Sequence, residues 1–149
     1  MKGIWAARRL VGAAISRLDP QKSRVYMGED VGVPIKEMPA LIRRVQQIAG
    51  KLDIPAMKYG HIGDGNLHVA LFIDISDEEQ WGKLRQAADR IHRAALDLGG
   101  TVSSEHGIGL ARAEYLQEQM GSDAFSLMQS IKKSFDPKGI LNPGKMSLS

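Results

Sequence analysis

Cysteine is absent from this 149-residue chain, which excludes disulfide frameworks, zinc fingers and thiol chemistry. The absence fits a reducing compartment, and we expect a cytoplasmic location. Aromatic residues make up only 5% of the chain, and no stacking motif interleaves its basic residues, so nucleic-acid binding is not expected. No apolar run approaches the ~20 residues that span a bilayer, so no transmembrane segment is expected.

The remaining composition is that of one soluble globular domain, with 43% hydrophobic and 25% charged residues. The net charge is +3, and the positive charge is concentrated at the front of the chain. Residues 1–24 carry one acid, Asp19, against six cations: Lys2, Arg8, Arg9, Arg17, Lys22 and Arg24. A basic segment of this kind is interpreted as a helix whose arginines face a partner, a substrate or water. A mitochondrial transit peptide is the weaker alternative.

Hydrophobic periodicity predicts an α+β fold. Helices are expected over residues 3–18, 34–50 and 77–98, and near 111–119 and 122–134. Extended segments are expected over residues 24–33, 54–62, 67–75 and 101–104, with 67–74 as a central, largely buried strand. The order β-α-β-β-α-β predicts an antiparallel sheet with helices packed on one face, a ferredoxin-like arrangement. The tail, residues 135–149, is expected to be irregular because it is rich in proline and glycine.

The dipeptide Asp64-Gly65 is a strong hairpin signal, because a two-residue type I′ turn needs a positive φ at both central positions. Centred there, the turn predicts that His61 lies opposite His68. Directly opposed residues share a face, with Cβ atoms roughly 4.5–5.5 Å apart. Two imidazoles held that way can bind one metal ion, although an ordinary hairpin with two surface histidines also fits the pattern.

A catalytic zinc-type site uses three protein ligands and keeps one position open. Glu105, which follows the last predicted strand, is the candidate third ligand, and a solvated loop carboxylate is the alternative. Asp64 is less favoured because its side chain is expected to bond within the turn. His106 lies beside Glu105 and suits a general base, since imidazole accepts a proton near pH 7. His92 is expected on the surface of a helix, without a role.

Three long motifs then resemble the C-terminal domain of FAD-linked oxidases: residues 60–68 (GHIGDGNLH), 104–109 (SEHGIG) and 135–145 (FDPKGILNPGK). Trp5-x-x-Arg8 and residues 29–34 (EDVGVP) fit the same family, so the resemblance covers residues 1–149 as one domain. The family includes the glycolate oxidase flavin subunit, D-lactate dehydrogenase and D-2-hydroxyglutarate dehydrogenase. The resemblance implies oxidation of a D-2-hydroxy acid by hydride transfer to FAD.

The resemblance also implies roles for individual residues. His61, His68 and Glu105 would hold a divalent metal, Zn²⁺ or a similar ion, which would bind the substrate hydroxyl and carboxylate. His106 would take the hydroxyl proton. Substrate would be bound by Asn66 and by Arg8, with Arg9 as the alternative to Arg8. Asn142 would approach the flavin.

Family members are about 450 residues or longer, the size of several domains, and their FAD-binding half precedes this segment. The chain is therefore interpreted as the substrate- and metal-binding half, inactive alone, with residues 135–149 contacting an FAD-binding domain or subunit. A fragment, a separate subunit and a truncated gene product all fit. The competing hypothesis is a non-enzymatic domain that self-associates through the sheet face left exposed without the FAD-binding half, so a homo-oligomer is expected. A metal-dependent hydrolase is a weaker third reading.

Overall fold

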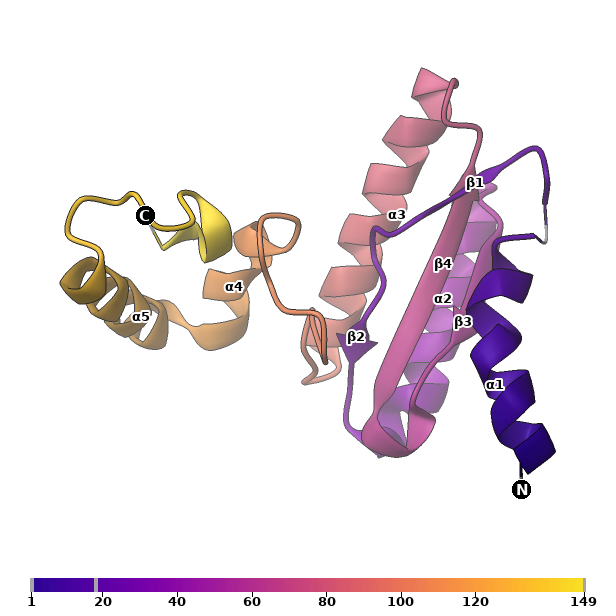
Figure 1. The fold of residues 1–149 in the computed structure, drawn as a ribbon, viewed down its shortest axis with the longest axis horizontal. Helices are drawn as coiled ribbons and strands as arrows, with labels where there is room; N and C mark the ends of the chain where they lie inside the picture. The colour runs from indigo at the N-terminus through magenta and orange to yellow at the C-terminus, as the bar shows by residue number, and fades with distance from the viewer. Residues whose placement is uncertain (1, 18, 149) are drawn as a thin grey trace.

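The computed structural model describes residues 2–17 and 19–148, and its sheet is built around one buried strand. Strand β4 (Asn66–Ile73) is buried at all eight positions, as predicted for residues 67–74. It pairs antiparallel with β1 (Ser23–Val25), β2 (Val31–Gly32) and β3 (Ala56–Tyr59). β2 and β3 flank β4 in Figure 1.

The antiparallel α+β prediction is confirmed, although two extended segments are shorter than expected. Residues 24–33 split into β1 and β2, and the strand predicted at 101–104 reduces to a single bridge between Thr101 and Gly32. That bridge places residue 101 beside β2, so the order across the sheet is Thr101, β2, β4, β3. This is the strand order of a ferredoxin-like domain, in which the first and third strands are central.

Helices α2 (Met38–Leu52) and α3 (Glu78–Asp97) cover one face of the sheet. The main core lies between them and the odd-numbered residues of β4, because successive side chains of a strand alternate between faces. It includes Leu41 and Val45 of α2, Leu67, Val69, Leu71 and Ile73 of β4, and Leu84 and Ile91 of α3. His68 is even-numbered, so its side chain projects from the other face.

The first helix, α1 (Lys2–Ile15), lies against that other face, so the helices are not confined to one side. Its last residue, Ile15, packs with Ala70 and Phe72, the next even-numbered residues of β4 beyond His68. The sheet face that carries His68 is therefore partly covered at one end and open toward the hairpin loop.

One helix end agrees with the expected bounds and one does not. The helix expected from residue 77 begins there, because the Asp77 carboxylate caps α3 by accepting hydrogen bonds from the backbone N–H groups of Glu79 and Gln80. Gly50 does not end α2. The helix continues to Leu52, and Asp53 adopts the left-handed conformation (φ 52°) that terminates it.

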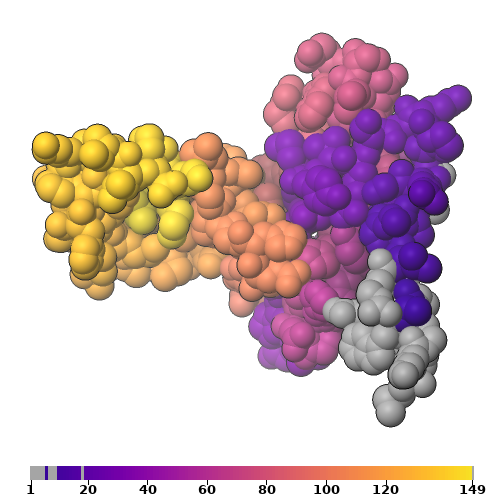
Figure 2. Space-filling model, in the orientation of Figure 1, coloured from indigo at the N-terminus to yellow at the C-terminus, as the bar shows by residue number. Residues whose placement is uncertain are grey.

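The C-terminal residues form an arm that projects from the sheet (Figure 2). It contains α4 (Ala113–Met120), α5 (Ser122–Phe135) and the short 3₁₀ turn η3 (Lys145–Ser147), with residues 136–144 irregular as expected. The turn is tied back by a hydrogen bond from the Met146 N–H to the Gly109 carbonyl, 2.7 Å. Of the helices described, none has the length and apolar character needed to cross a membrane.

Candidate metal and substrate site

The hairpin brings His61 and His68 together through a different register from the one predicted. Tyr59, not His61, pairs with His68, and the chain then turns through the 3₁₀ segment η2 (Ile62–Asp64). The prediction of a two-residue type I′ turn is therefore wrong. Instead, the His61 carbonyl accepts the Asn66 N–H and closes a four-residue loop. The slip is two residues, and an even slip keeps side chains on the same face. The two rings still lie 5.6 Å apart between centroids.

Gly65 makes this loop possible. It has a φ of 75°, a region that side-chain-bearing residues rarely adopt. A Cβ at this position would also overlap the carbonyl oxygen of Val33. The Gly65 carbonyl in turn accepts the Val33 N–H at 2.9 Å, which fixes the loop against the end of β2.

Three imidazoles converge on Glu105. Its Oε1 atom lies 2.8 Å from Nε2 of His68 and 3.6 Å from Nε2 of both His61 and His106. The rings of His68 and His106 are stacked, with centroids 5.4 Å apart. This geometry is consistent with the prediction that the four residues form one site. The contacts join the hairpin to the loop that follows Ser104.

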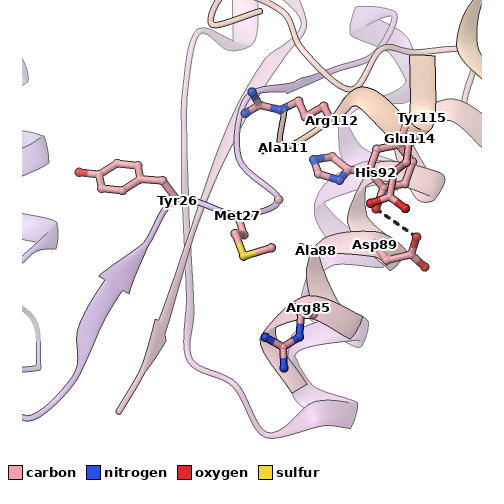
Figure 3. Close-up of a pocket in the computed structure, with 11 residues that line it drawn as sticks. Tyr26, Met27, Arg85, Ala88, Asp89, His92, Ala111, Arg112, Glu114 and Tyr115 are labelled. Carbon is pink, nitrogen blue, oxygen red and sulfur yellow. Dashed lines mark hydrogen bonds between the residues drawn. The ribbon is translucent and has the colours of Figure 1, made fainter. Parts of the chain in front are cut away.

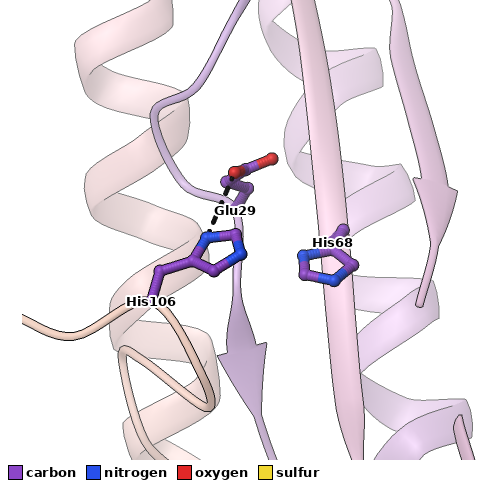
Figure 4. A group of neighbouring side chains, drawn as sticks. All are labelled: Glu29, His68 and His106. Carbon is purple, nitrogen blue, oxygen red and sulfur yellow. Dashed lines mark ion pairs between the residues drawn. The ribbon is translucent and has the colours of Figure 1, made fainter. Parts of the chain in front are cut away.

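His61, His68 and Glu105 fit a divalent metal as a donor set. Their ligand atoms all lie within 4.8 Å of one another, and two imidazoles with one carboxylate are a common set for zinc with an open position. A second trio, Glu29, His68 and His106, satisfies the same geometric test (Figure 4). Glu29 is already paired with the buried guanidinium of Arg24 at 3.4 Å, and that positive charge disfavours a cation there. The first trio is the better metal site.

Asp30 holds the loop that carries Glu105 and His106, a role the sequence interpretation missed. The residue is fully buried, and its carboxylate accepts hydrogen bonds from the N–H groups of Glu105 and His106 (3.1 and 2.8 Å). It also accepts from the Ser103 hydroxyl at 2.6 Å and from the Asn66 side-chain amide at 3.2 Å. Burial alone raises the pKa of Asp30, but these hydrogen bonds outweigh it and lower the pKa below the ordinary range.

The guanidinium of Arg112 makes a second connection to the same loop. It donates to the carbonyl oxygens of Gly107 and Glu29, each at 2.9 Å.

The backbone of Asp30 is also unusual. It has a φ of 68°, an uncommon conformation for a residue other than glycine, and such residues cluster at functional sites. In the sequence, Glu29 and Asp30 stand out only as part of the family pattern of residues 29–34, because their partners lie far along the chain and leave no local signal.

Asn66 lies beside the histidines, at the start of β4. Its side chain is buried, with Nδ2 bonded to Asp30 and Oδ1 lacking a hydrogen-bond partner among the described residues. A buried oxygen without a partner is costly unless a ligand or water satisfies it. This fits the predicted contact of Asn66 with substrate.

The other two predicted site residues are Arg8 and Asn142. The backbone of Arg8 lies in α1, but its side chain, like that of Arg9, falls outside the described part of the structure. Asn142 lies in the arm, where its carbonyl accepts the Lys145 N–H at 3.3 Å. The loop around residues 105–112 separates this tail from β4 (Figure 1).

A cavity of about 280 Å³ lies on the other side of Arg112, between α3, α4 and residues 26–28 (Figure 3). His92 lines it together with Ala88, Asp89 and Tyr115. His92 is not a surface residue as expected: it is 4% exposed, and neither ring nitrogen has a hydrogen-bond partner among the described residues. Burial, assisted by the positive charge of Arg112, lowers the pKa of His92 to about 4.

We expect this buried histidine to make stability depend on pH. Because the folded pKa of about 4 lies below the unfolded value of 6.5, the unfolded state binds more protons between the two. Stability is therefore full above about pH 6.5 and falls as pH drops toward 4, by about 3 kcal/mol in total. Urea unfolding at several pH values should show this slope, and His92→Leu should reduce it. Equal slopes in both proteins would contradict the assignment.

Comparison with known proteins decides the family. The family described as FAD linked oxidases, C-terminal domain, matches residues 1–146. The chain belongs to this family. It is 39% identical over 140 residues to glycolate oxidase subunit GlcD of Bacillus subtilis, covering 94% of this chain and 29% of that protein. The FAD-oxidase C-terminal fold thus agrees with the resemblance carried by residues 60–68, 104–109 and 135–145.

Other relatives of this FAD-oxidase domain are named for different substrates. The probable mitochondrial D-lactate dehydrogenase of Danio rerio is 34% identical, covering 96% of this chain and 28% of that protein. The D-2-hydroxyglutarate dehydrogenase of Stutzerimonas stutzeri is 30% identical, covering 98% and 31%. A solved 4-ethylphenol oxidase from Gulosibacter chungangensis, in complex with isoeugenol, shares the fold (TM-score 0.64, 20% identity), covering 91% of this chain and 26% of that one. The chain spans less than a third of each of these proteins.

Proposed function

We propose that this chain is the substrate- and metal-binding half of an FAD-dependent dehydrogenase of D-2-hydroxy acids, of the glycolate or D-lactate type. The observation that carries the proposal is the convergence of His61, His68 and His106 on Glu105 at the open end of the sheet face. The relatives named for glycolate, D-lactate and D-2-hydroxyglutarate support the substrate class.

A divalent metal held by His61, His68 and Glu105 would supply Lewis-acid chemistry that lowers the pKa of a bound hydroxyl group. His106 has its Nε2 atom on the same side as these ligands, where it can accept the hydroxyl proton. The unpartnered Oδ1 of Asn66 can accept a hydrogen bond from substrate. We assign Arg8 to the substrate carboxylate, because a guanidinium binds a carboxylate in a bidentate manner.

FAD is assigned to a part of the enzyme outside this chain. Within residues 2–17 and 19–148 the sheet is antiparallel, so it is not the doubly wound Rossmann fold, in which parallel strands joined by helices bind dinucleotides. The histidines, their loop and the tail around Asn142 would face the FAD-binding part. Hydride acceptance belongs to the flavin, and the residues of this chain bind and orient the hydroxy acid.

The arm supports a docking role for the C-terminal segment. Leu127, Ile131 and Phe135 recur every four residues along α5 and are 62%, 51% and 83% exposed. Residues at this spacing form one stripe on a helix. Ile140 and Leu141 of the tail are also exposed. We propose that this apolar surface contacts the FAD-binding domain or subunit.

The proposal is tested by reconstitution. The chain alone should bind about one divalent ion per molecule and show no flavin absorbance. Mixed with the FAD-binding half of a close relative, it should oxidise glycolate, D-lactate or D-2-hydroxyglutarate, measured by dye reduction. Absence of metal from the purified, zinc-exchanged chain would reject the site, and absence of turnover with every substrate would reject the enzymatic role.

The exposed stripe on α5 also favours a second candidate function, a non-enzymatic domain that self-associates through this surface. Sedimentation should then show a homo-oligomer that Leu127→Glu converts to a monomer, and the reconstituted mixture should remain inactive. Turnover in the mixture would reject this alternative.

A further inference from the structure

Glu29 approaches the ring of His106 at Nδ1, the nitrogen that does not face Glu105. Its Oε1 atom lies 3.5 Å from Nδ1 of His106 (Figure 4). Nε2 of the same ring lies 3.6 Å from Oε1 of Glu105. The two nitrogens of His106 therefore face different carboxylates. The Glu29 side chain is only 5% exposed, whereas that of Glu105 is 42% exposed.

The buried carboxylate of Glu29 is held by its own partners. Arg24, whose side chain is 7% exposed, pairs with Oε2 of Glu29 at 3.4 Å and also donates to the Tyr59 hydroxyl. The guanidinium lies over the Tyr26 ring, 4.3 Å from its centroid. A buried carboxylate needs such a partner, and Arg24 occupies one oxygen while the other faces His106.

The backbone of Glu29 is fixed to the loop that carries His106. Arg112 donates to the carbonyls of Glu29 and Gly107, the residues on either side of the contact. The neighbouring Asp30 carboxylate accepts the backbone N–H of His106. Glu29 and His106 are therefore held at a set separation even though the His106 ring is half exposed.

A neutral imidazole has one N–H and one lone pair, and a carboxylate partner selects which nitrogen carries the hydrogen. We propose that Glu29 is a positioning residue that accepts the Nδ1–H of His106 and so turns the Nε2 lone pair toward the metal ligands and substrate. This inference rests on the proposed role of His106 as the proton acceptor. Carboxylates orient histidines in this way at metal sites and in catalytic triads.

The alternative use of Glu29, as a metal ligand with His68 and His106, is disfavoured by Arg24. A divalent ion bound to Oε1 of Glu29 would lie next to a buried guanidinium. The Nδ1–H group of a neutral His106 carries less positive charge than a divalent ion. It also needs only one acceptor, which Oε1 of Glu29 supplies while Oε2 pairs with Arg24. The two uses are distinguishable, because one requires Nδ1 to carry a hydrogen and the other forbids it.

The test is a ¹H–¹⁵N multiple-bond correlation spectrum of the full chain with one equivalent of Zn²⁺, at a pH where imidazoles are neutral. His106 signals are assigned with His106→Asn. We expect the Nδ1–H tautomer to dominate. Glu29→Met should shift the tautomer ratio by about tenfold or more toward Nε2–H, and Glu29→Gln should largely restore it because its amide oxygen accepts the same hydrogen.

Glu29→Met leaves Arg24 unpaired, so the double variant Arg24→Met/Glu29→Met provides a second measurement without a buried lone charge. It should show the same shift, whereas Arg24→Met alone should keep the wild-type tautomer. A dominant Nε2–H tautomer in the wild type, or a ratio unchanged by both Glu29→Met variants, would overturn the inference. If zinc fails to bind, the proposed function fails, and the zinc-free spectrum still reports whether Glu29 selects the tautomer.

Discussion

Replacing His68 with Ala should lower the zinc affinity of the chain by more than about 100-fold, because even residues that only orient a ligand change affinity 10–100-fold. His68 is the most buried of the three proposed ligands and makes the shortest contact with Glu105, 2.8 Å. The change also leaves His61 and Glu105 without the strand residue that holds them at a fixed separation. Competition titration with a chromophoric chelator measures the affinity directly.

His92→Ala is the matched control for this substitution. His92 is as buried as His68 but lines the cavity on the other side of Arg112, so its removal should leave zinc affinity unchanged. Both variants create a cavity and are expected to lose stability, and unfolding curves separate that loss from a loss of ligand. Equal zinc affinity in His68→Ala and the wild type would show that the ion, if bound, lies elsewhere.

The pairing of His61 with His68 could be predicted because it depends on local signals. The extended segments predicted over residues 54–62 and 67–75 and the turn residues at 63–65 were sufficient to place both histidines on one face. The turn type was wrong, since Gly65 reaches the end of β2 through its hydrogen bond with Val33, a contact 32 residues away in sequence. The predicted face of the sheet was still correct, because the register differs by two residues and side chains alternate with a period of two.

The support for the site could not be predicted in the same way. Asp30 accepts hydrogen bonds from Ser103, Glu105 and His106, more than seventy residues later in the chain. No periodicity in the sequence reports such a contact. Likewise His92 was placed on the surface because charged neighbours surround it in sequence, whereas the packing of Tyr115 over its ring buries it. Local pattern indicates faces and turns, and long-range hydrogen bonds decide which polar residues are structural.

Asp30→Ala should destabilise the chain by about 3–5 kcal/mol, because it leaves several buried donors without an acceptor. This is a large share of the 5–15 kcal/mol that stabilises a typical domain. Since the pKa of Asp30 is lowered in the folded state, its contribution is full above the ordinary value near 4 and is lost as pH falls through the lower folded value. Urea unfolding at pH 7 measures the cost, which should shrink in acid.

The same substitution should also weaken zinc binding by about 10- to 100-fold, since Asp30 fixes the backbone of Glu105 without touching the ion. Asp136→Ala is the matched control. Asp136 is also buried and accepts the N–H groups of Ile140 and Leu141, with Lys132 beside it, but it lies in the arm. It should cost local stability and leave zinc affinity intact. If both variants weaken zinc binding equally, the loss reflects general unfolding, and Asp30 has no specific role in placing Glu105.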